Sequence, residues 1–252
     1  KVLLVEREGY LGGQLGSGLP FLAFFDTHQR RIVGGLAQEM VDRLADLEFG
    51  TIGHRYCPHH LSTTSINQFY TRIICFQWAK ECGIQLLMHC ELSDAQVIGG
   101  RLQSVTVTGK GMAFEIRAKI YIDGTGDGDL GYMAGATYEK GHVLQPPTLM
   151  FNLGGVNLER FIDYIAAHPE ELLYNVNPDT PPGYDADFFR SNPGHVFVGL
   201  SATLERLRAQ DKCPVDRDTV IYIRLPIPGH VAVNTIRILN CDGSNIHDLS
   251  RG

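Results

Sequence analysis

The sequence predicts an α/β fold on three observations: an aliphatic run at its start, helical periodicity further along, and paired glycines between the elements. Residues 2–5 are four consecutive aliphatic side chains followed by Glu6. A strand that is apolar on both faces is typical of a parallel sheet covered by helices on each side. Because such a strand normally lies inside a sheet, we expect this chain to be a fragment of a longer protein.

The composition is that of a globular protein and argues against several other classes. Of the 252 residues, 44% are hydrophobic and 20% are charged, which is enough for a sizeable core. The 22 basic and 28 acidic residues give a net charge of −6, so we expect neither a nucleic-acid partner nor an anionic membrane surface. No apolar run approaches the roughly 18 residues of a membrane span. The six cysteines include no C-x-x-C pair, which favours reduced thiols and a cytoplasmic location.

Glycines and periodicity define the elements that follow the first strand. A glycine-rich loop is expected over residues 9–18. Residues 51–64 are rich in histidine and aperiodic, so we expect a loop there as well. Between them a helix follows Gly34 and Gly35, with apolar residues at helical spacing at Leu36, Met40, Leu44 and Leu47.

A second helix and a three-stranded meander are expected next. Thr64 or Ser65 can cap the helix and Gly83 can end it, and residues 84–89 then form a short strand. Turn glycines separate three alternating runs, which predicts antiparallel hairpins. The runs are residues 95–98, 102–107 and 113–122.

The composition changes near residue 145, after which Pro146 and Pro147 interrupt the chain. Strand and helix patterns continue beyond this point, so we expect two domains, residues 1–145 and residues 146–252, the second being a smaller α+β portion. Its expected strands are 148–153, 195–201, 219–225 and 230–239, and its expected helices are 158–167 and 202–209.

Glu6 is the first candidate for chemistry because it lies at the expected carboxyl end of the first strand. In a dinucleotide-binding fold an acidic residue there accepts hydrogen bonds from ribose hydroxyls, and it would serve a nicotinamide dinucleotide equally well. A solvated charge at a strand end is the alternative interpretation. The G-x-G-x-x-G fingerprint that normally precedes such an acid by about 20 residues would lie upstream of this sequence.

Two glycine turns are candidates for binding a phosphate or a flat ring. Gly12 and Gly13, followed by Gln14, let the backbone approach a ligand without a Cβ in the way, although a flexible loop is the alternative. The turn Thr125-Gly126-Asp127 precedes a short helical segment, where small residues can form an anion-binding corner. Asp127 could accept a ribose or ribityl hydroxyl, or cap the helix.

A histidine-rich cluster is the last candidate, with His54, Tyr56, Cys57, His59 and His60. It lacks the second half of a regular zinc motif, so we expect no metal; a metal-dependent hydrolase is the corresponding alternative. We interpret the cluster as polar side chains lining a cavity, where one histidine can act as acid or base near neutral pH. The candidates for substrate contact are Asp26, His28, Arg31, His54 and His59.

Four stretches of the chain, taken in order, resemble the FAD-dependent oxidoreductase family, which shares its nucleotide domain with the glutathione reductase and fumarate reductase flavoproteins. They are VLLVEREGYLGGQLGSG (2–18), IVGGLAQEMVDRL (32–44), YIDGTGDGDLGYMAGATYEKG (121–141) and PPTLMFNLGGVN (146–157). The resemblance implies a partial Rossmann-like FAD-binding domain with a β-meander insertion, followed by part of a substrate domain.

The resemblance also implies which residues bind FAD. In the family, the strand-end acid binds the adenosine ribose, the loop glycines lie near the pyrophosphate and flavin, the strand after the second helix contacts adenine through its backbone, and the T-G-D turn closes over the dinucleotide. The matching residues here are Glu6 with Arg7 beside it, Gly12, Gly13 and Gln14, Glu91 and Leu92, and Thr125, Gly126 and Asp127.

The function expected from the resemblance is that of an oxidoreductase in which FAD passes hydride or electrons to or from a small-molecule substrate. The alternative is a non-catalytic nucleotide-binding or interaction domain that has lost the glycine fingerprint. Neither the substrate nor the oligomeric state follows from the residues.

Overall fold

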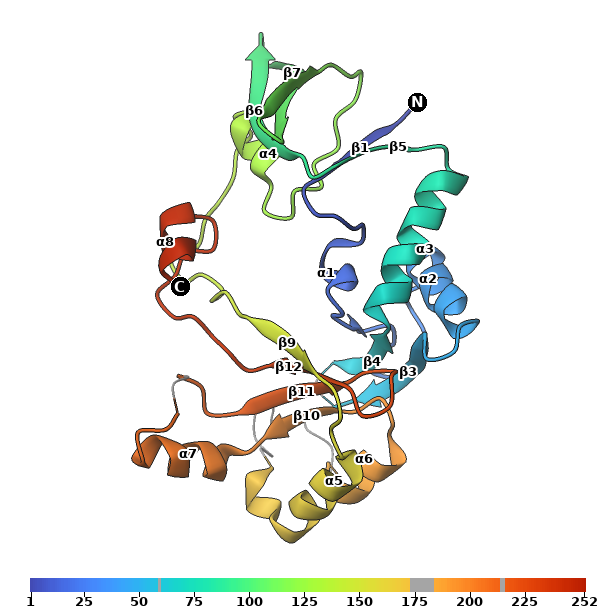
Figure 1. The fold of residues 1–252 in the computed structure, drawn as a ribbon, viewed down its shortest axis with the longest axis vertical. Helices are drawn as coiled ribbons and strands as arrows, with labels where there is room; N and C mark the ends of the chain where they lie inside the picture. Colours follow the sequence, from blue (N-terminus) through green and yellow to red (C-terminus); the bar gives the residue numbers. More distant parts are fainter. Residues whose placement is uncertain (59, 173–183, 214–215) are drawn as a thin grey trace. The chain divides into compact units, whose positions relative to one another are not determined.

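The computed structural model describes residues 1–58, 60–172, 184–213 and 216–252 (Figure 1). The described residues have mixed α/β structure with several separate sheets, and they form two compact units. Unit 1 comprises Lys1–Leu11, Cys75–Gln145 and Asp242–Arg251, and unit 2 comprises Gly12–Ile74, Pro146–Cys241 and Gly252. Among the described helices, none combines the length and the apolar character needed to cross a lipid bilayer.

The first strand of unit 1 forms where the aliphatic run predicts it. Strand β1 (Leu3–Glu6) pairs in parallel with β5 (Gln85–Met88), and Glu6 lies opposite Met88. The expected burial on both faces is wrong, because Leu3 and Leu4 are 43% and 37% exposed. The physical reason is that, in the described residues, the sheet contains only these two strands.

The predicted meander of unit 1 is confirmed. Its strands are β6 (Glu91–Ile98), β7 (Arg101–Gly109) and β8 (Met112–Ile116), paired antiparallel in that order. Strand β8 ends six residues before the expected position 122, because Tyr121 folds back and its hydroxyl donates to the carbonyl of Gln103 at 2.8 Å. The unit is completed by the helices α4 (Asp129–Met133) and α8 (Ile246–Arg251).

Unit 2 contains a three-stranded sheet where the sequence suggested a loop. Strand β4 (Leu61–Ile66) lies between β2 (Phe21–Leu22) and β3 (Thr51–Cys57), so the loop expected over residues 51–64 is wrong. The hydroxyl residues of β4 are fully buried, and Ser62 Oγ accepts a hydrogen bond from the Phe24 amide at 2.8 Å. These internal bonds let a polar segment form the centre of a sheet.

The helices of this part of unit 2 are α1 (Gly13–Gly16), α2 (Gly35–Ala45) and α3 (Gln68–Glu81), the last of which continues into unit 1. Helix α2 is confirmed, with Met40 and Leu44 buried. Helix α3 begins later than expected because Asn67, rather than Thr64 or Ser65, accepts the Phe69 amide at 3.0 Å.

The second sheet of unit 2 confirms the strands and helices expected beyond residue 146. Its order is β10-β11-β12-β9, and all pairs are antiparallel. The elements are β9 (Met150–Leu153), α5 (Leu158–Ala167), the 3₁₀ turn η1 (Pro169–Glu171), α6 (Ala186–Ser191), β10 (Val196–Gly199), α7 (Ser201–Ala209), β11 (Val220–Arg224) and β12 (Val231–Asn234). Helices α6 and α8 were not predicted.

The core of unit 2 consists of two apolar clusters. The larger contains buried residues of α5, α6, β10, β11 and β12, including Phe189 and Phe197. The smaller joins Cys57 of β3 to Val196 and Ile223 of the second sheet. The two sheets of unit 2 are therefore packed against each other around shared apolar side chains.

Candidate functional site

Glu6 ends β1 with its side chain half-buried at the carboxyl edge of the parallel pair. One carboxylate oxygen, Oε1, accepts the Glu8 amide at 2.9 Å, which holds the side chain at the start of the following loop. The Glu6 carbonyl accepts the Cys90 amide at 3.0 Å, so the chain leaving β5 runs directly beside it. In open α/β sheets, ligands bind at this edge of the strands.

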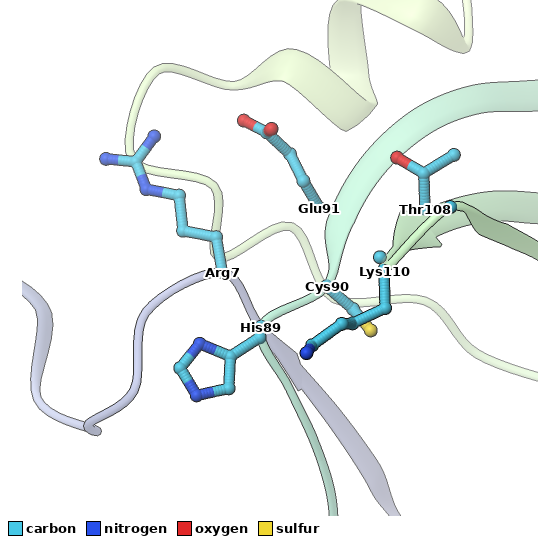
Figure 2. Close-up of a pocket in the computed structure, with 8 residues that line it drawn as sticks. Arg7, His89, Cys90, Glu91, Thr108 and Lys110 are labelled. Atoms are coloured by element: carbon cyan, nitrogen blue, oxygen red, sulfur yellow. The ribbon is translucent and has the colours of Figure 1, made fainter.

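A pocket of about 340 Å³ lies beside this strand end within unit 1 (Figure 2). Two residues implied by the family resemblance, Arg7 and Glu91, line it. Arg7 is exposed and forms an ion pair with Glu8 at 3.5 Å. The full lining is Arg7, His89, Cys90, Glu91, Thr108, Gly109, Lys110 and Gly111. Leu92, the other residue expected at adenine, is half-buried and pairs with Val107 in the meander.

Close backbone contacts bring the meander to this pocket. A Cβ at Gly109 would lie 2.6 Å from the carbonyl oxygen of His89 and 2.8 Å from Sγ of Cys90, so only glycine allows the end of β7 to approach this segment. A Cβ at Gly9 would likewise meet the His89 ring at 2.9 Å. The two glycines therefore fix the His89 side of the pocket.

The Thr125-Gly126-Asp127 turn of unit 1 is built by a residue that the sequence did not single out. Asp123 Oδ1 accepts the amide and the hydroxyl of Thr125 at 3.0 and 2.7 Å, and Oδ2 accepts the Gly131 amide at 2.9 Å. Burial of Asp123 opposes its ionisation, but these hydrogen bonds outweigh that effect and lower its pKa below 3.8. The Thr125 hydroxyl in turn accepts the Asp129 amide at 2.9 Å, which anchors the start of α4.

The glycines of this turn face open space. A Cβ built at Gly124, Gly126 or Gly128 has no heavy atom within 4 Å. Gly126 and Gly128 have φ of 94° and 79°, which explains why they are glycine, but Gly124 has no such conformational reason. The backbone of the turn is thus uncovered and accessible to a ligand, and the side chain of Asp127 is exposed beside it.

The expected Gly12-Gly13-Gln14 turn lies at the start of unit 2. Gly12 has φ of 112° and precedes the short helix α1, and Gly13 has φ of 51° with open space around its Cβ position. Gln14 is exposed. The end of α1 is held by Arg72, whose Nε donates to the Gly16 carbonyl at 2.7 Å.

Asp26 organises a turn in unit 2. Its Oδ1 accepts the amides of His28 and Arg30, both at 2.9 Å, and its Oδ2 accepts Arg30 Nε at the same distance. The hydrogen bond from the Arg30 amide is the largest cause of the lowered pKa of Asp26. This carboxylate therefore has a structural role, while the neighbouring candidates His28 and Arg31 are exposed.

His54 is held in place by partners at both ring nitrogens. Nδ1 lies 2.7 Å from the Thr64 hydroxyl and Nε2 lies 3.0 Å from Gln38 Oε1. Burial, and then the positive charge of Arg31, lowers the pKa of His54 below 6.5, so the ring is neutral at pH 7. The ring also packs against Phe24 at a centroid distance of 4.5 Å.

The remaining members of the histidine cluster are not brought together as a site. His59 lies outside the described residues. Across the described part of the chain, no three His, Cys, Asp or Glu side chains converge in a way that could hold a metal ion. His60 is exposed, and partial desolvation by its neighbours lowers its pKa below 6.5.

Sequence reasoning missed several residues of the unit 1 site. His89, Cys90 and Lys110 line the pocket, and Asp123 supports the glycine turn. The Lys110-Gly111 pair between two alternating runs could have indicated part of the pocket. It predicts a hairpin turn after β7, at the end that lies beside the start of β6. The contact of Gly109 with His89 has no local signature.

Comparisons with known proteins identify the family of the chain. A family model described as FAD dependent oxidoreductase matches residues 1–235. A comparison with curated proteins found no significant match. Among solved structures, the chain is similar to FqzB at 10% sequence identity with a TM-score of 0.43, covering 98% of this chain and 50% of that one. The chain therefore spans about half the length of FqzB.

Proposed function

Since the chain belongs to the FAD-dependent oxidoreductase family, whose cofactor is FAD, we propose that unit 1 binds the adenosine half of that cofactor. The observation that carries the proposal is the position of Glu6 at the carboxyl end of the parallel pair β1–β5. We take this pair to belong to a Rossmann-like FAD-binding domain.

The residues of unit 1 fit the chemistry of FAD. One oxygen of the Glu6 carboxylate accepts a hydrogen bond from the Glu8 amide, and the second oxygen can accept one from a ribose hydroxyl. The uncovered glycine turn at residues 124–128 can approach the dinucleotide without a Cβ in the way. Asp127 supplies a further acceptor, and Arg7 and Glu91 flank the neighbouring pocket.

Unit 2 carries the other residues that we assign to the reaction. Gly12, Gly13 and Gln14 follow β1 within a few residues, and we propose that they lie near the pyrophosphate and the flavin. His28 and Arg31 are exposed and free to meet an anionic or polar substrate. His54, by contrast, uses both ring nitrogens within the protein, so we assign it to positioning the local sheet and not to proton transfer.

The bound flavin supplies the redox chemistry, exchanging a hydride or electrons with a small-molecule substrate. The protein binds and orients the cofactor, with residues 1–145 serving the dinucleotide and residues 146–252 the substrate. We propose a cytoplasmic location, which the lack of a C-x-x-C pair among the six cysteines favours.

The test is retention of FAD by the purified chain. After incubation with FAD and removal of excess cofactor, we expect visible flavin absorbance in the wild-type protein and reduced absorbance in Glu6→Gln. Glu8→Gln is the matched control, since it removes the same charge two residues away. Equal retention by all three proteins would contradict the role of Glu6, and retention by none would contradict the cofactor assignment. Bleaching of the bound flavin by candidate hydride donors then tests the reaction.

A further inference from the structure

We propose that Arg217 and Arg237 of unit 2 form a binding site for a small oxyanion, a phosphate or carboxylate group, which uses none of the residues assigned to FAD. The two arginines lie in the segment before β11 and the segment after β12. These strands are antiparallel neighbours, with Tyr222 opposite Val233, so the start of one and the end of the other share an edge of the second sheet (Figure 1). Residues far apart in the sequence thereby meet at this edge.

Hydrogen bonds hold Arg237 against the segment that carries Arg217. Just beyond the paired residues, the Ile221 amide donates to the Thr235 hydroxyl at 3.2 Å, so the two chains continue side by side. Further along, Nη2 of Arg237 donates to the carbonyl of Asp216 at 3.3 Å. The Arg237 guanidinium is therefore fixed beside the residue that directly precedes Arg217.

The electrostatics of Arg217 agree with this placement. Burial lowers the pKa of the Arg217 guanidinium, and the positive charge of Arg237 lowers it further. Arginine nevertheless stays protonated in proteins at neutral pH, so two like charges lie near each other at this edge. An anion bound between them would remove the repulsion and accept charge-assisted hydrogen bonds from both guanidinium groups.

The acidic residues beside the two arginines, Asp216 and Asp218, form no ion pair with them in the described structure. Asp218 is engaged instead by Arg208 of α7, whose Nη2 lies 3.4 Å from Asp218 Oδ1 and donates to the Arg217 carbonyl at 3.0 Å. Arg237 bonds the backbone carbonyl of Asp216 and not its carboxylate. Within the described ranges, the half-buried guanidinium of Arg217 has neither a hydrogen bond nor an ion pair. Its donors are thus uncommitted and can bind an incoming anion.

The guanidinium groups determine the class of ligand. Each is a planar fork of N–H donors whose spacing matches two oxygens of a phosphate or a carboxylate group. The partial burial of Arg217 strengthens such hydrogen bonds, because the local dielectric is lower than that of water. A chloride ion has no second oxygen to complete the fork. The site therefore selects oxyanions over a halide of the same charge.

The experiment follows the thermal unfolding midpoint of the full chain in rising concentrations of inorganic phosphate or acetate, with chloride keeping the ionic strength constant. An anion that binds the folded chain raises the midpoint, and the concentration dependence gives its dissociation constant. We expect Arg217→Gln and Arg237→Gln each to weaken binding at least about tenfold, the loss of one charge-assisted hydrogen bond.

Two further variants and a control sharpen this experiment. Because both arginines hold one anion, the double variant should lose less affinity than the product of the two single losses. Arg217→Lys keeps the charge without the fork, so it should bind more tightly than Arg217→Gln and more weakly than wild type. The matched control is Arg160→Gln on α5, which removes an exposed arginine of the same unit and should bind as wild type does.

Each outcome supports or overturns the site. A rise of the midpoint with phosphate alone identifies the ligand as a phosphate group, and a rise with acetate alone identifies it as a carboxylate. No rise beyond that in chloride overturns the site. An equal loss of affinity in Arg160→Gln also overturns it, because the effect would then be general charge screening, and so does a fully multiplicative loss in the double variant. The midpoint of each variant in chloride shows that its fold is intact, and Arg217→Lys replaces Arg217→Gln where the latter does not fold.

Discussion

Unit 2 buries its side chains, whereas unit 1 leaves most of its own exposed. Unit 2 contains two apolar clusters and fully buried polar residues such as Ser62 and His195. The buried residues of unit 1 are only Leu11, Ala79, Cys90, Ser104, Val105 and Val107. Aliphatic residues such as Ile120 and Ile122 of unit 1 are 78% and 88% exposed.

The difference separates the residues that stabilise the protein from those that we assign to the cofactor. In unit 2, side-chain packing supplies the stability, so truncation there should lower the free energy of unfolding. In unit 1, turns and strand pairing hold an accessible backbone, so substitutions there should change binding more than stability.

The largest expected effect is truncation in the core of unit 2. Phe189 is completely buried, and its ring contacts Tyr184, His195 and Phe197. Phe189→Ala should lower the free energy of unfolding by about 3–5 kcal/mol, from lost burial and the cavity left behind. Leu4→Ala in unit 1 is the comparison, and it should cost less than about 1.5 kcal/mol because Leu4 is already partly exposed. Denaturant unfolding followed by circular dichroism measures both free energies of unfolding. Equal losses in the two variants would contradict the proposed difference between the two units.

A buried carboxylate of unit 2 should show the next largest effect. The Glu171 carboxylate accepts hydrogen bonds from the Thr203 amide at 3.0 Å and from the Tyr164 hydroxyl at 3.1 Å. The bond to Thr203 caps the start of α7. Replacing it by glutamine converts an acceptor into a donor, and Glu171→Gln should cost about 1–3 kcal/mol. Chemical unfolding at neutral pH measures the loss, with Glu205→Gln on the exposed side of α7 as the control.

The same carboxylate predicts a pH dependence. Burial opposes the ionisation of Glu171, but hydrogen bonds from Thr203 and Tyr164 outweigh it and hold the pKa below 4.5. Because the folded pKa is depressed, the stabilisation is present above pH 4.5 and is lost as the pH falls through the folded value. Below pH 4.5 the stability of wild type should therefore approach that of Glu171→Gln. A constant gap between the two proteins down to pH 2 would contradict this role of the carboxylate.

Two glycines of the unit 1 turn provide a smaller and sharper comparison. Gly126→Ala should cost about 1–2 kcal/mol, because alanine resists the positive φ. Gly124→Ala meets no atom within 4 Å and should change stability by less than about 0.5 kcal/mol. Both should weaken FAD binding if the turn contacts the cofactor. Fluorescence titration measures FAD affinity and thermal unfolding measures stability. An unchanged FAD affinity of Gly124→Ala would contradict the assignment of the turn to the FAD site.

A loss of stability smaller than that of Gly126→Ala is expected at Asp123, the residue that supports this turn. Asp123→Asn keeps an oxygen for Thr125 but loses the acceptor for the Gly131 amide, at a cost of about 1 kcal/mol. We expect Asp123→Asn to weaken FAD binding by more than it lowers the free energy of unfolding. Asp129→Asn, in the first turn of α4, is the matched control and should leave the affinity unchanged. Equal affinities of the two variants would show that the turn does not depend on Asp123.

Much of the fold could be predicted because its signals are local. The aliphatic run predicts β1, and the paired turn residues predict the meander. The strands at 51–66 could not be predicted in this way, because several of their polar groups pair with partners far away in the sequence. The Ser62 hydroxyl bonds to the Phe24 amide, and the Tyr56 carbonyl accepts Asn192 Nδ2 at 2.8 Å. Neither contact has a periodic signature.

The candidate site divides in the same way. Glu6 and the Thr125-Gly126-Asp127 turn were identified from sequence because an acid after a strand and glycines before a helix are local patterns. The pocket was missed because it depends on Gly109 approaching the carbonyl of His89, twenty residues away along the chain. Lys110 lines the pocket because of that approach.

Comparing the affinity of the purified chain for FAD with that for FMN tests the central claim most directly, because only FAD carries the adenosine that unit 1 is proposed to bind. We predict that FAD binds at least about tenfold more tightly than FMN, the equivalent of one good charge-assisted hydrogen bond, and that Glu6→Gln removes most of the difference. Equal affinities for FAD and FMN in the wild-type chain would contradict the claim.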